Sequence, residues 1–386
     1  MIPGVSIITA NGNIGGAVNT QDGITGAIVT GTGTGTVALL TPKKVVSLVD
    51  AETQGFTASA EPIANRLIKE FYSIPGTLGV PLYLMLVAET TLVTSLCDKD
   101  NVNGAKKLVD FAAGSLRVLA IGRKPGVAYT PVAPAFIDSD VTGAVANAKA
   151  FVTDRFAKIQ PLRIILEARI HDETNTTVFL PNTVAANGVA FAIGGTLNDK
   201  SASLGLILGK IAAVPVHRNI GRVKDGALPV DAMFIGTKKV EAFAALNTLI
   251  DAGYITFTNY PQKAGYYISD DPMATAATDD YRFLTNCRVI DKASIIAYQT
   301  YIEELKDDVD LDATGKIAAI ILSHLESVIE NNISLAMSES ISGKPRAYID
   351  PAQNLATGSN LKVKLRITPK GYLKSIEVEI GFGITN

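Results

Sequence analysis

A glycine–threonine repeat, Gly31-Thr-Gly-Thr-Gly-Thr36, is the stretch that comes nearest to a phosphate-binding loop. It follows an apolar run at 24–30, as such loops follow a strand, and the N–H groups of a glycine turn can surround a phosphate. However, its spacing is not that of GxGxxG, and Pro42 leaves little room for a helix to begin on it. Gly209-Lys210 is followed by Ile211, so the Walker pattern fails too. The repeat is expected to form a flexible turn.

Acidic residues and one histidine stand together at a few places, where they could act as acid–base groups or metal ligands. His171-Asp172-Glu173 falls on a predicted loop, and Asp270-Asp271 and Asp279-Asp280 could bracket a divalent cation. None has EF-hand spacing, and no GxSxG turn is present to hold a nucleophilic serine. Helix capping and turn formation explain such acidic pairs. We therefore predict no catalytic residue, no metal site and no cofactor, and we expect that the protein is not an enzyme.

The composition argues against several other classes of protein. The 35 lysines and arginines against 37 aspartates and glutamates leave a net charge of −2, which disfavours direct nucleic-acid binding. Cys97 and Cys287 stand far apart, which excludes a disulfide- or zinc-stapled fold. The hydrophobic fraction is an ordinary 47%, whereas the charged fraction of 19% is below the roughly 25% that is typical. Such a chain fits a surface that copies of itself partly cover.

The sequence carries no signal for export or membrane insertion. Its first residues, Met1 to Val5, lack the basic and apolar regions of a signal peptide. The longest apolar run, Val80 to Ala88, is too short to span a bilayer. We expect an intracellular protein without a membrane anchor.

Apolar runs alternate with helical patterns between residues 24 and 260. Helices are predicted after Ala60, where Pro62 marks a start, and over 143–156 and 203–213. Strands are predicted at the apolar runs 24–30, 80–88, 116–121, 162–168, 178–180, 189–193, 253–258 and 263–268. Strand–helix–strand order predicts an α/β fold with mixed or parallel sheets flanked by helices.

The first residues have the pattern of an arm. Val5, Ile7 and Thr9 alternate with Ser6, Ile8 and Ala10, which indicates a short strand, and the glycine-spaced stretch 11–16 is typical of a slack connection. A strand on a tether is expected to add to the edge of another sheet.

From Asp279 onward the pattern becomes helical. One stripe of a predicted helix consists of Ile295, Tyr298, Ile302 and Leu305. A second helix is predicted from about Gly315 to Met337, with a stripe made of Ile317, Ile321, Leu325 and Val328. A polar segment, 338–359, then leads to the C-terminal region.

Two strands with matched charges are predicted near the C-terminus. In the first strand, Leu361, Val363, Leu365 and Ile367 alternate with Lys362, Lys364 and Arg366; in the second, Ile376, Val378, Ile380 and Phe382 alternate with Glu377, Glu379 and Gly381. In an antiparallel pairing with Ile367 opposite Ile376, Arg366 meets Glu377 and Lys364 meets Glu379. The same register suits pairing within one chain or between two chains, and both remain open.

The order of these motifs resembles that of contractile tail sheath proteins, of phages and of related bacterial injection systems. The chain begins with Pro3-Gly4-Val5, and Pro42–Glu52 leads through Gly55-Phe56 and a helix to Val80–Leu84, similar to the family's order of strand, short helix, glycine, helix and strand. Further on, Gly265–Asp270 and Arg288-Val-Ile-Asp-Lys292 resemble the start of the family's long helical part. The strands at 361–382 are similar to its closing strands.

The resemblance implies a structural subunit with a mixed α/β core and two arms that exchange strands between subunits. The residues expected to pair between subunits are Val5, Ile7, Thr9, Lys364, Arg366, Glu377, Val378, Glu379 and Ile380. The expected parts are an N-terminal arm (1–23), a mixed α/β region (24–260), a C-terminal core region with two long helices (261–350) and C-terminal strands (351–386).

The same resemblance implies the partners and the place of assembly. Copies of the chain would stack as rings into a helical sheath around an inner tail tube, in contact with baseplate and tail terminator proteins. Assembly would take place in the bacterial host cytoplasm, and the product would be a virion tail in a phage. The alternative is an intracellular α/β enzyme that binds a phosphorylated ligand at the Gly31–Thr36 turn.

Overall fold

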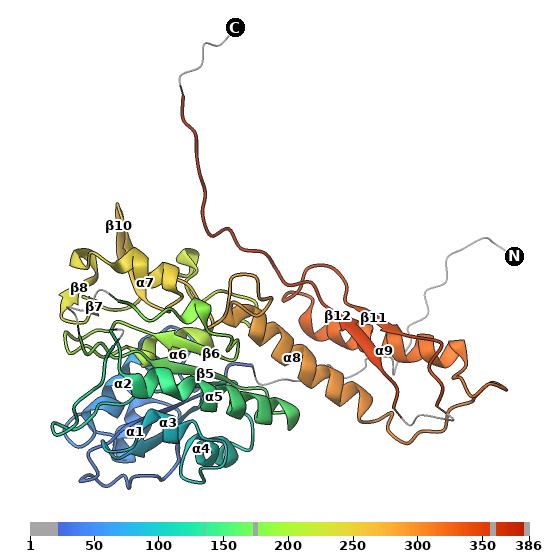
Figure 1. Cartoon of the computed structure of the whole chain (residues 1–386), viewed down its shortest axis with the longest axis horizontal. Helices are drawn as coiled ribbons and strands as arrows, with labels where there is room; N and C mark the ends of the chain where they lie inside the picture. Colours follow the sequence, from blue (N-terminus) through green and yellow to red (C-terminus); the bar gives the residue numbers. More distant parts are fainter. Residues whose placement is uncertain (1–21, 135, 173–176, 356–359, 382–386) are drawn as a thin grey trace, which may run out of the picture. The chain divides into compact units, whose positions relative to one another are not determined.

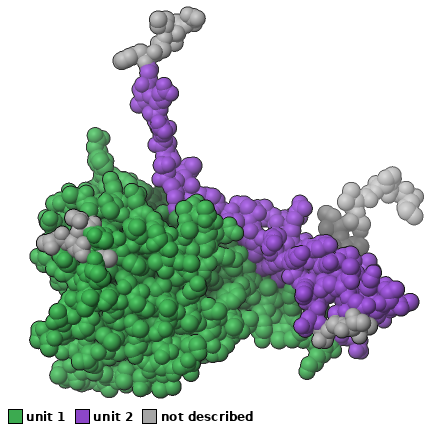
Figure 2. All heavy atoms as spheres, viewed as in Figure 1, with its two compact units in different colours: residues 1–306 green, residues 307–386 purple. Residues whose placement is uncertain are grey.

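The computed structural model describes residues 22–134, 136–172, 177–355 and 360–381 of the chain (Figure 1). The chain divides into two compact units, one that ends at Lys306 and one that begins at Asp307 (Figure 2). The four parts predicted from sequence have other boundaries, and that division remains a prediction.

A six-stranded sheet forms the centre of the first unit. The order of its strands is β2-β3-β1-β4-β5-β6, and only β2 runs antiparallel to its neighbour. The strands are β1 (Thr25–Thr30), β2 (Lys43–Val45), β3 (Leu82–Val87), β4 (Val118–Ile121), β5 (Arg163–Glu167) and β6 (Val189–Ala192). The predicted α/β class is therefore confirmed.

Helices cover the sheet because the parallel strands are joined by helical crossovers. On one face, α2 (Pro62–Ser73) and α6 (Leu204–Ala213) pack against each other and against β1. On the other face lie α3 (Val93–Leu96), α4 (Ala105–Phe111) and α5 (Ser139–Ala157). A Cβ atom at Gly205 of α6 would lie 2.2 Å from the carbonyl oxygen of Leu67 in α2, so only glycine allows these helices to approach so closely.

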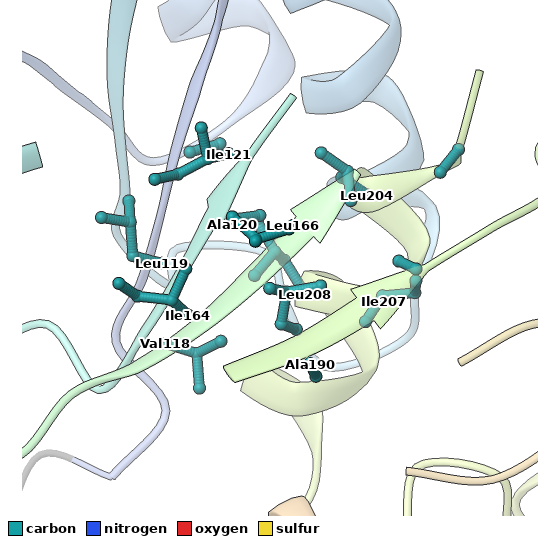
Figure 3. Close-up of a cluster of buried hydrophobic side chains, with 14 of the residues drawn as sticks. Val118, Leu119, Ala120, Ile121, Ile164, Leu166, Ala190, Leu204, Ile207 and Leu208 are labelled. Carbon is teal, nitrogen blue, oxygen red and sulfur yellow. The ribbon is translucent and has the colours of Figure 1, made fainter. Parts of the chain in front are cut away.

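The core of the first unit lies between the sheet and its helices. All four residues of β4 are buried, as expected for a strand covered on both faces. Figure 3 shows the side chains of β4 and β5 gathered with Leu204, Ile207 and Leu208 of α6. This double coverage is why the strands appear in the sequence as continuous apolar runs.

The predicted order of strand, short helix, glycine, helix and strand is present in the structure. It corresponds to β2, α1 (Leu48–Thr53), Gly55, α2 and β3. Ser47 caps α1 by accepting a hydrogen bond from the Asp50 N–H at 3.0 Å. The apolar residues Leu48 and Val49 therefore begin a helix and do not continue the strand β2. Lysines at 43 and 44 on the short edge strand β2 discourage pairing with another sheet.

In its described residues, the remainder of the first unit contains small hairpins and two helices, one short and one long. These elements are β7 (Phe234–Ile235), β8 (Lys238–Lys239), α7 (Leu246–Ala252), β9 (Phe257–Tyr260), β10 (Lys263–Ile268) and α8 (Leu284–Tyr301). The strand predicted at 178–180 is wrong, because this segment has no ladder partner; Phe179 instead packs its ring on Phe191, with 5.3 Å between the ring centroids. The strand predicted at 253–258 begins later, at Phe257.

The Arg288-Val-Ile-Asp-Lys292 motif fastens α8 to the rest of the first unit. Arg288 donates to the carbonyl oxygens of Ile211 and Val214, at 2.9 and 3.1 Å. Asp291 accepts from Arg163 of β5 with both carboxylate oxygens, and both side chains are buried. Burial lowers the pKa of Arg163, but the adjacent Asp291 outweighs it and holds the guanidinium charged.

The described residues of the second unit form one helix and a two-stranded antiparallel ribbon. The helix is α9 (Ala319–Met337), and the ribbon consists of β11 (Arg346–Ile349) and β12 (Val363–Arg366). The buried face of α9 is formed by Leu322, Leu325, Ile329, Ile333 and Met337. The helix predicted at 315–337 is thus present, although its predicted stripe shares only Leu325 with that face. In the described ranges, no helix has the length and apolar character needed to cross a membrane.

Candidate functional site

The β11–β12 ribbon corrects the within-chain version of the predicted C-terminal pairing. β12 contains the predicted residues Lys364 and Arg366, but its partner is β11, with Lys364 opposite Tyr348 and Arg366 opposite Arg346. Residues 370–381 form no helix or strand. Within one chain β12 therefore pairs with a nearer strand, which has little signal in the sequence because it is short and only half apolar.

The exposed face of the ribbon is strongly basic. Arg346 and Arg366 lie directly opposite each other, which is an unfavourable cross-strand pair. Lys364 lies beside them, with its Nζ 6.0 Å from the centre of the Tyr348 ring. In the described part of the chain, no ion pair is formed by any of these three cations. These three side chains can therefore form ion pairs with an acidic partner.

The opposite face of the ribbon is apolar and turned toward the interior of its unit. Ile349 is buried, and Val363 and Leu365 are half-buried. The alternation predicted for residues 361–367 is thus confirmed as a strand with one apolar and one basic face over Val363–Arg366.

One edge of β12 is free. In an antiparallel pair, alternate residues direct their backbone groups toward the partner strand and away from it. The side chain of Gln353 accepts from the N–H of Lys362 at 2.7 Å and donates to its carbonyl oxygen at 3.0 Å, on the β11 side. The backbone N–H and carbonyl groups of the even-numbered residues in this segment therefore face β11. Val363 and Leu365 consequently direct their N–H and carbonyl groups outward, and within the described ranges these groups have no backbone partner.

The segment after the ribbon has the side chains of a strand without a neighbour. Ile376, Val378 and Ile380 are 73%, 69% and 90% exposed, and Glu377 and Glu379 between them are exposed as well. Figure 2 shows residues of this segment as a thin extension of the purple unit. An apolar row that alternates with acids and lies in solvent is typical of a surface that a partner covers.

The remaining residues of the predicted strand pairing are not among the described residues. Val5, Ile7 and Thr9 lie outside the described residues, as does Phe382 at the far end of the predicted register. Their roles remain predictions.

Two family models account for almost the whole sequence. The model described as DUF2586, N-terminal domain, matches residues 2–272, and the model described as DUF2586, C-terminal domain, matches residues 280–386. The chain belongs to the DUF2586 family. No curated protein matches this DUF2586 chain.

Solved structures show which fold the DUF2586 chain has. It is similar to the helical sheath of the anti-feeding prophage in its contracted state, with a TM-score of 0.62, 12% identity and 99% of each chain covered. A chain of the baseplate of the same particle gives a TM-score of 0.62 and 11% identity, over 99% of this chain and 100% of that one.

A third similar structure is the sheath complex of PVC, an extracellular contractile injection system, in its contracted state. Its TM-score is 0.62 with 12% identity, over 99% of this chain and 97% of that one. The DUF2586 chain therefore has the fold of contractile sheath proteins, as its sequence predicts.

The Gly31–Thr36 turn of the DUF2586 chain does not have the electrostatics of a phosphate site. The N–H of Thr32 donates to the carboxylate of Glu61 at 2.8 Å, and the Thr32 hydroxyl donates to the other carboxylate oxygen at 2.9 Å. Glu61 is buried just before α2. Its carboxylate bonds an amide that a phosphate would need and would repel the ligand, so the enzyme alternative gains no support.

The edge of the sheet where α/β enzymes bind ligands is nearly filled. A cavity there is lined by Val29 of β1, Gly122 after β4 and Glu167 of β5, and has a volume of about 20 Å³. This is enough for about one water molecule. No group of histidine, cysteine, aspartate and glutamate side chains in the described ranges could hold a metal ion.

Two of the remaining chemical candidates, Asp271 and Asp279, accept structural backbone hydrogen bonds. Asp271 accepts from the Thr285 N–H at 2.8 Å at the start of α8, and Asp279 accepts from the Tyr281 N–H at 2.8 Å. Burial lowers the pKa of His171, and Glu173 lies outside the described residues. Burial also raises the pKa of Cys287 to about 12, so its thiol is unreactive at neutral pH.

Proposed function

We propose that this chain is a sheath subunit, a structural protein without enzymatic activity that polymerises into a helical contractile sheath. The observation that carries the proposal is the match of the whole chain to contractile sheath chains over 99% of its length. The free edge of β12 and the exposed segment 376–381 support it independently, since both need a second molecule to cover them.

The contact between subunits is strand exchange. Residues 376–381 of one copy add antiparallel to the outer edge of β12 in another copy, with Leu365 opposite Val378 and Val363 opposite Ile380. Because Val363 and Leu365 already direct their backbone groups outward, these pairs can exchange two hydrogen bonds each. Every apolar side chain of the incoming strand then lies on the apolar face of the ribbon.

The same register places acids on the basic face. Glu377 lies beside Arg366, which in turn lies beside Arg346, and Glu379 lies beside Lys364. The acidic strand then offsets the modest cross-strand repulsion between the two arginines. An interaction that is unfavourable in the free subunit thereby favours the assembled state.

Strand donation from one copy to the next is a heterologous contact, which propagates into a helix or a ring instead of closing as a dimer. The N-terminal arm, with Val5, Ile7 and Thr9, donates a second strand, and its glycines at 12–16 serve as a tether. During contraction the subunits move as rigid bodies while both arms hold the mesh together.

The sheath surrounds an inner tail tube and meets baseplate and tail terminator proteins at its ends. Contraction drives the tube forward and delivers DNA or an effector, without direct contact with nucleic acid and without a membrane anchor. Assembly takes place in the bacterial host cytoplasm, and the sheath becomes part of the virion tail in a phage.

A charge exchange tests the register. Lys364→Glu/Arg366→Glu should reduce assembly, because two acids would then face Glu377 and Glu379, and Glu377→Lys/Glu379→Lys in the same chain should restore most of it. Sedimentation of the assembled fraction measures both effects. The expected coupling is on the order of 1–2 kcal/mol for the two pairs together. If the four substitutions behave additively, the two strands do not pair in this register.

A further inference from the structure

The outer edge of β11 differs from the outer edge of β12, because helix α9 supplies acceptors to it. The N–H of Ala347 donates to Oε1 of Glu330 at 2.7 Å, and the N–H of Ile349 donates to Oε1 of Glu326 at 2.6 Å. Both glutamates are half-buried. Ala347 and Ile349 are the residues of β11 whose backbone groups face away from β12, so these carboxylates occupy the positions that the carbonyl groups of a further strand would take.

The spacing of the two glutamates fits the strand. Residues four apart on a helix lie on the same face, about 6 Å apart along the axis. Alternate residues of a strand are about 6.7 Å apart. Glu326 and Glu330 can therefore reach alternate N–H groups of β11 with one helical turn between them, and α9 packs along this strand (Figure 1).

We propose that Glu326 and Glu330 close the outer edge of β11, so that a subunit accepts a neighbour's strand only on β12. This inference rests on the strand exchange of the proposed function, and it determines the direction in which the ribbon grows. The two arms cannot occupy opposite edges of the same ribbon.

Counting bound strands tests the proposal in the full-length chain. Val378→Pro disables a subunit's own donor strand, since proline lacks the N–H that would bond Leu365, and it leaves the acceptor ribbon unchanged. The probe is a synthetic peptide with the sequence of residues 372–384, and native mass spectrometry gives the number of peptides per chain. Glu326→Ala/Glu330→Ala removes both acceptors and thereby opens the outer edge of β11. The matched control is Glu326→Gln/Glu330→Gln, which keeps an acceptor oxygen at each position.

We expect one bound peptide for the Val378→Pro chain and for its glutamine control, and two for its alanine variant. One peptide on the alanine variant, or two with both glutamates intact, would overturn the closed edge while strand exchange stands. No peptide on the Val378→Pro chain would overturn strand exchange and the closed edge with it.

A second measurement covers the case in which the alanine variant does not fold. In the Val378→Pro chain, hydrogen exchange at the amides of Ala347 and Ile349 should be about tenfold slower, or more, than at Val363 and Leu365, because only the former donate to a partner. Equal exchange rates at the two edges would contradict the proposal.

Discussion

Val378→Pro should strongly impair assembly and leave the subunit folded. Val378 is 69% exposed in the single chain and belongs to no strand, so the free subunit loses nothing by the change. In the proposed exchange, its N–H bonds Leu365 of the neighbour, and proline removes that donor and disfavours a central ladder position. The loss of a single ladder bond is expected to raise the critical concentration for assembly by about tenfold or more. Electron microscopy with sedimentation measures assembly, and circular dichroism measures folding.

The matched control is Glu379→Pro. In the same register the N–H of Glu379 faces away from β12, so proline at this position removes no bond to the neighbour, only the pairing of one acid with Lys364. We expect Glu379→Pro to assemble at close to the wild-type concentration. Equal effects of the two prolines would mean that the segment contacts its neighbour through side chains alone or lies elsewhere.

Asp291→Asn should destabilise the subunit strongly, by about 3–5 kcal/mol. The change leaves Arg163 charged and buried without its carboxylate, and it separates α8 from the central sheet at the contact that both oxygens of Asp291 make. Urea unfolding followed by circular dichroism gives the change in the free energy of unfolding.

Asp154→Asn is the control for Asp291→Asn, because it makes the same chemical change in an exposed ion pair. Asp154 lies 2.8 Å from Lys158, one helical turn further along α5, and the two side chains are 28% and 53% exposed. Such a pair contributes about 0.3–0.5 kcal/mol. If Asp291→Asn costs no more than this control, the motif at 288–292 does not hold α8 in place through its charges.

The central sheet could be predicted from the sequence because its strands are buried on both faces. A continuous apolar run coincides with each of the strands β1, β3, β4, β5 and β6. Such a run can be recognised without knowing which elements pack against it. Helix α2 could be located in the same way, from Pro62 at its start and from an apolar stripe.

The pairing of β12 could not be predicted from local pattern. Charge matching favours residues 376–381 as its partner, whereas the chain itself pairs β12 with β11 and places Arg346 opposite Arg366. Helix α9 packs along β11 and accepts hydrogen bonds from it. These contacts leave no pattern in the local sequence of residues 346–349. Tertiary contact therefore outweighs the cross-strand charges, which are worth little at an exposed ribbon.

The stripe predicted for α8 shows a similar limit. Ile295 is buried, but Tyr298, Ile302 and Leu305 further along are 45%, 43% and 65% exposed. The periodicity correctly indicates a helix over the first of these residues. It does not tell whether an apolar face is covered by the same chain or by another, because both give the same pattern in sequence.

Negative-stain electron microscopy of the purified wild-type chain tests the central claim most directly. The account predicts hollow tubes of regular diameter with a helical repeat, formed without nucleotide or any other added ligand. The account is contradicted if the wild-type chain shows only single particles of the size of one subunit, as the Val378→Pro chain does at the same concentrations.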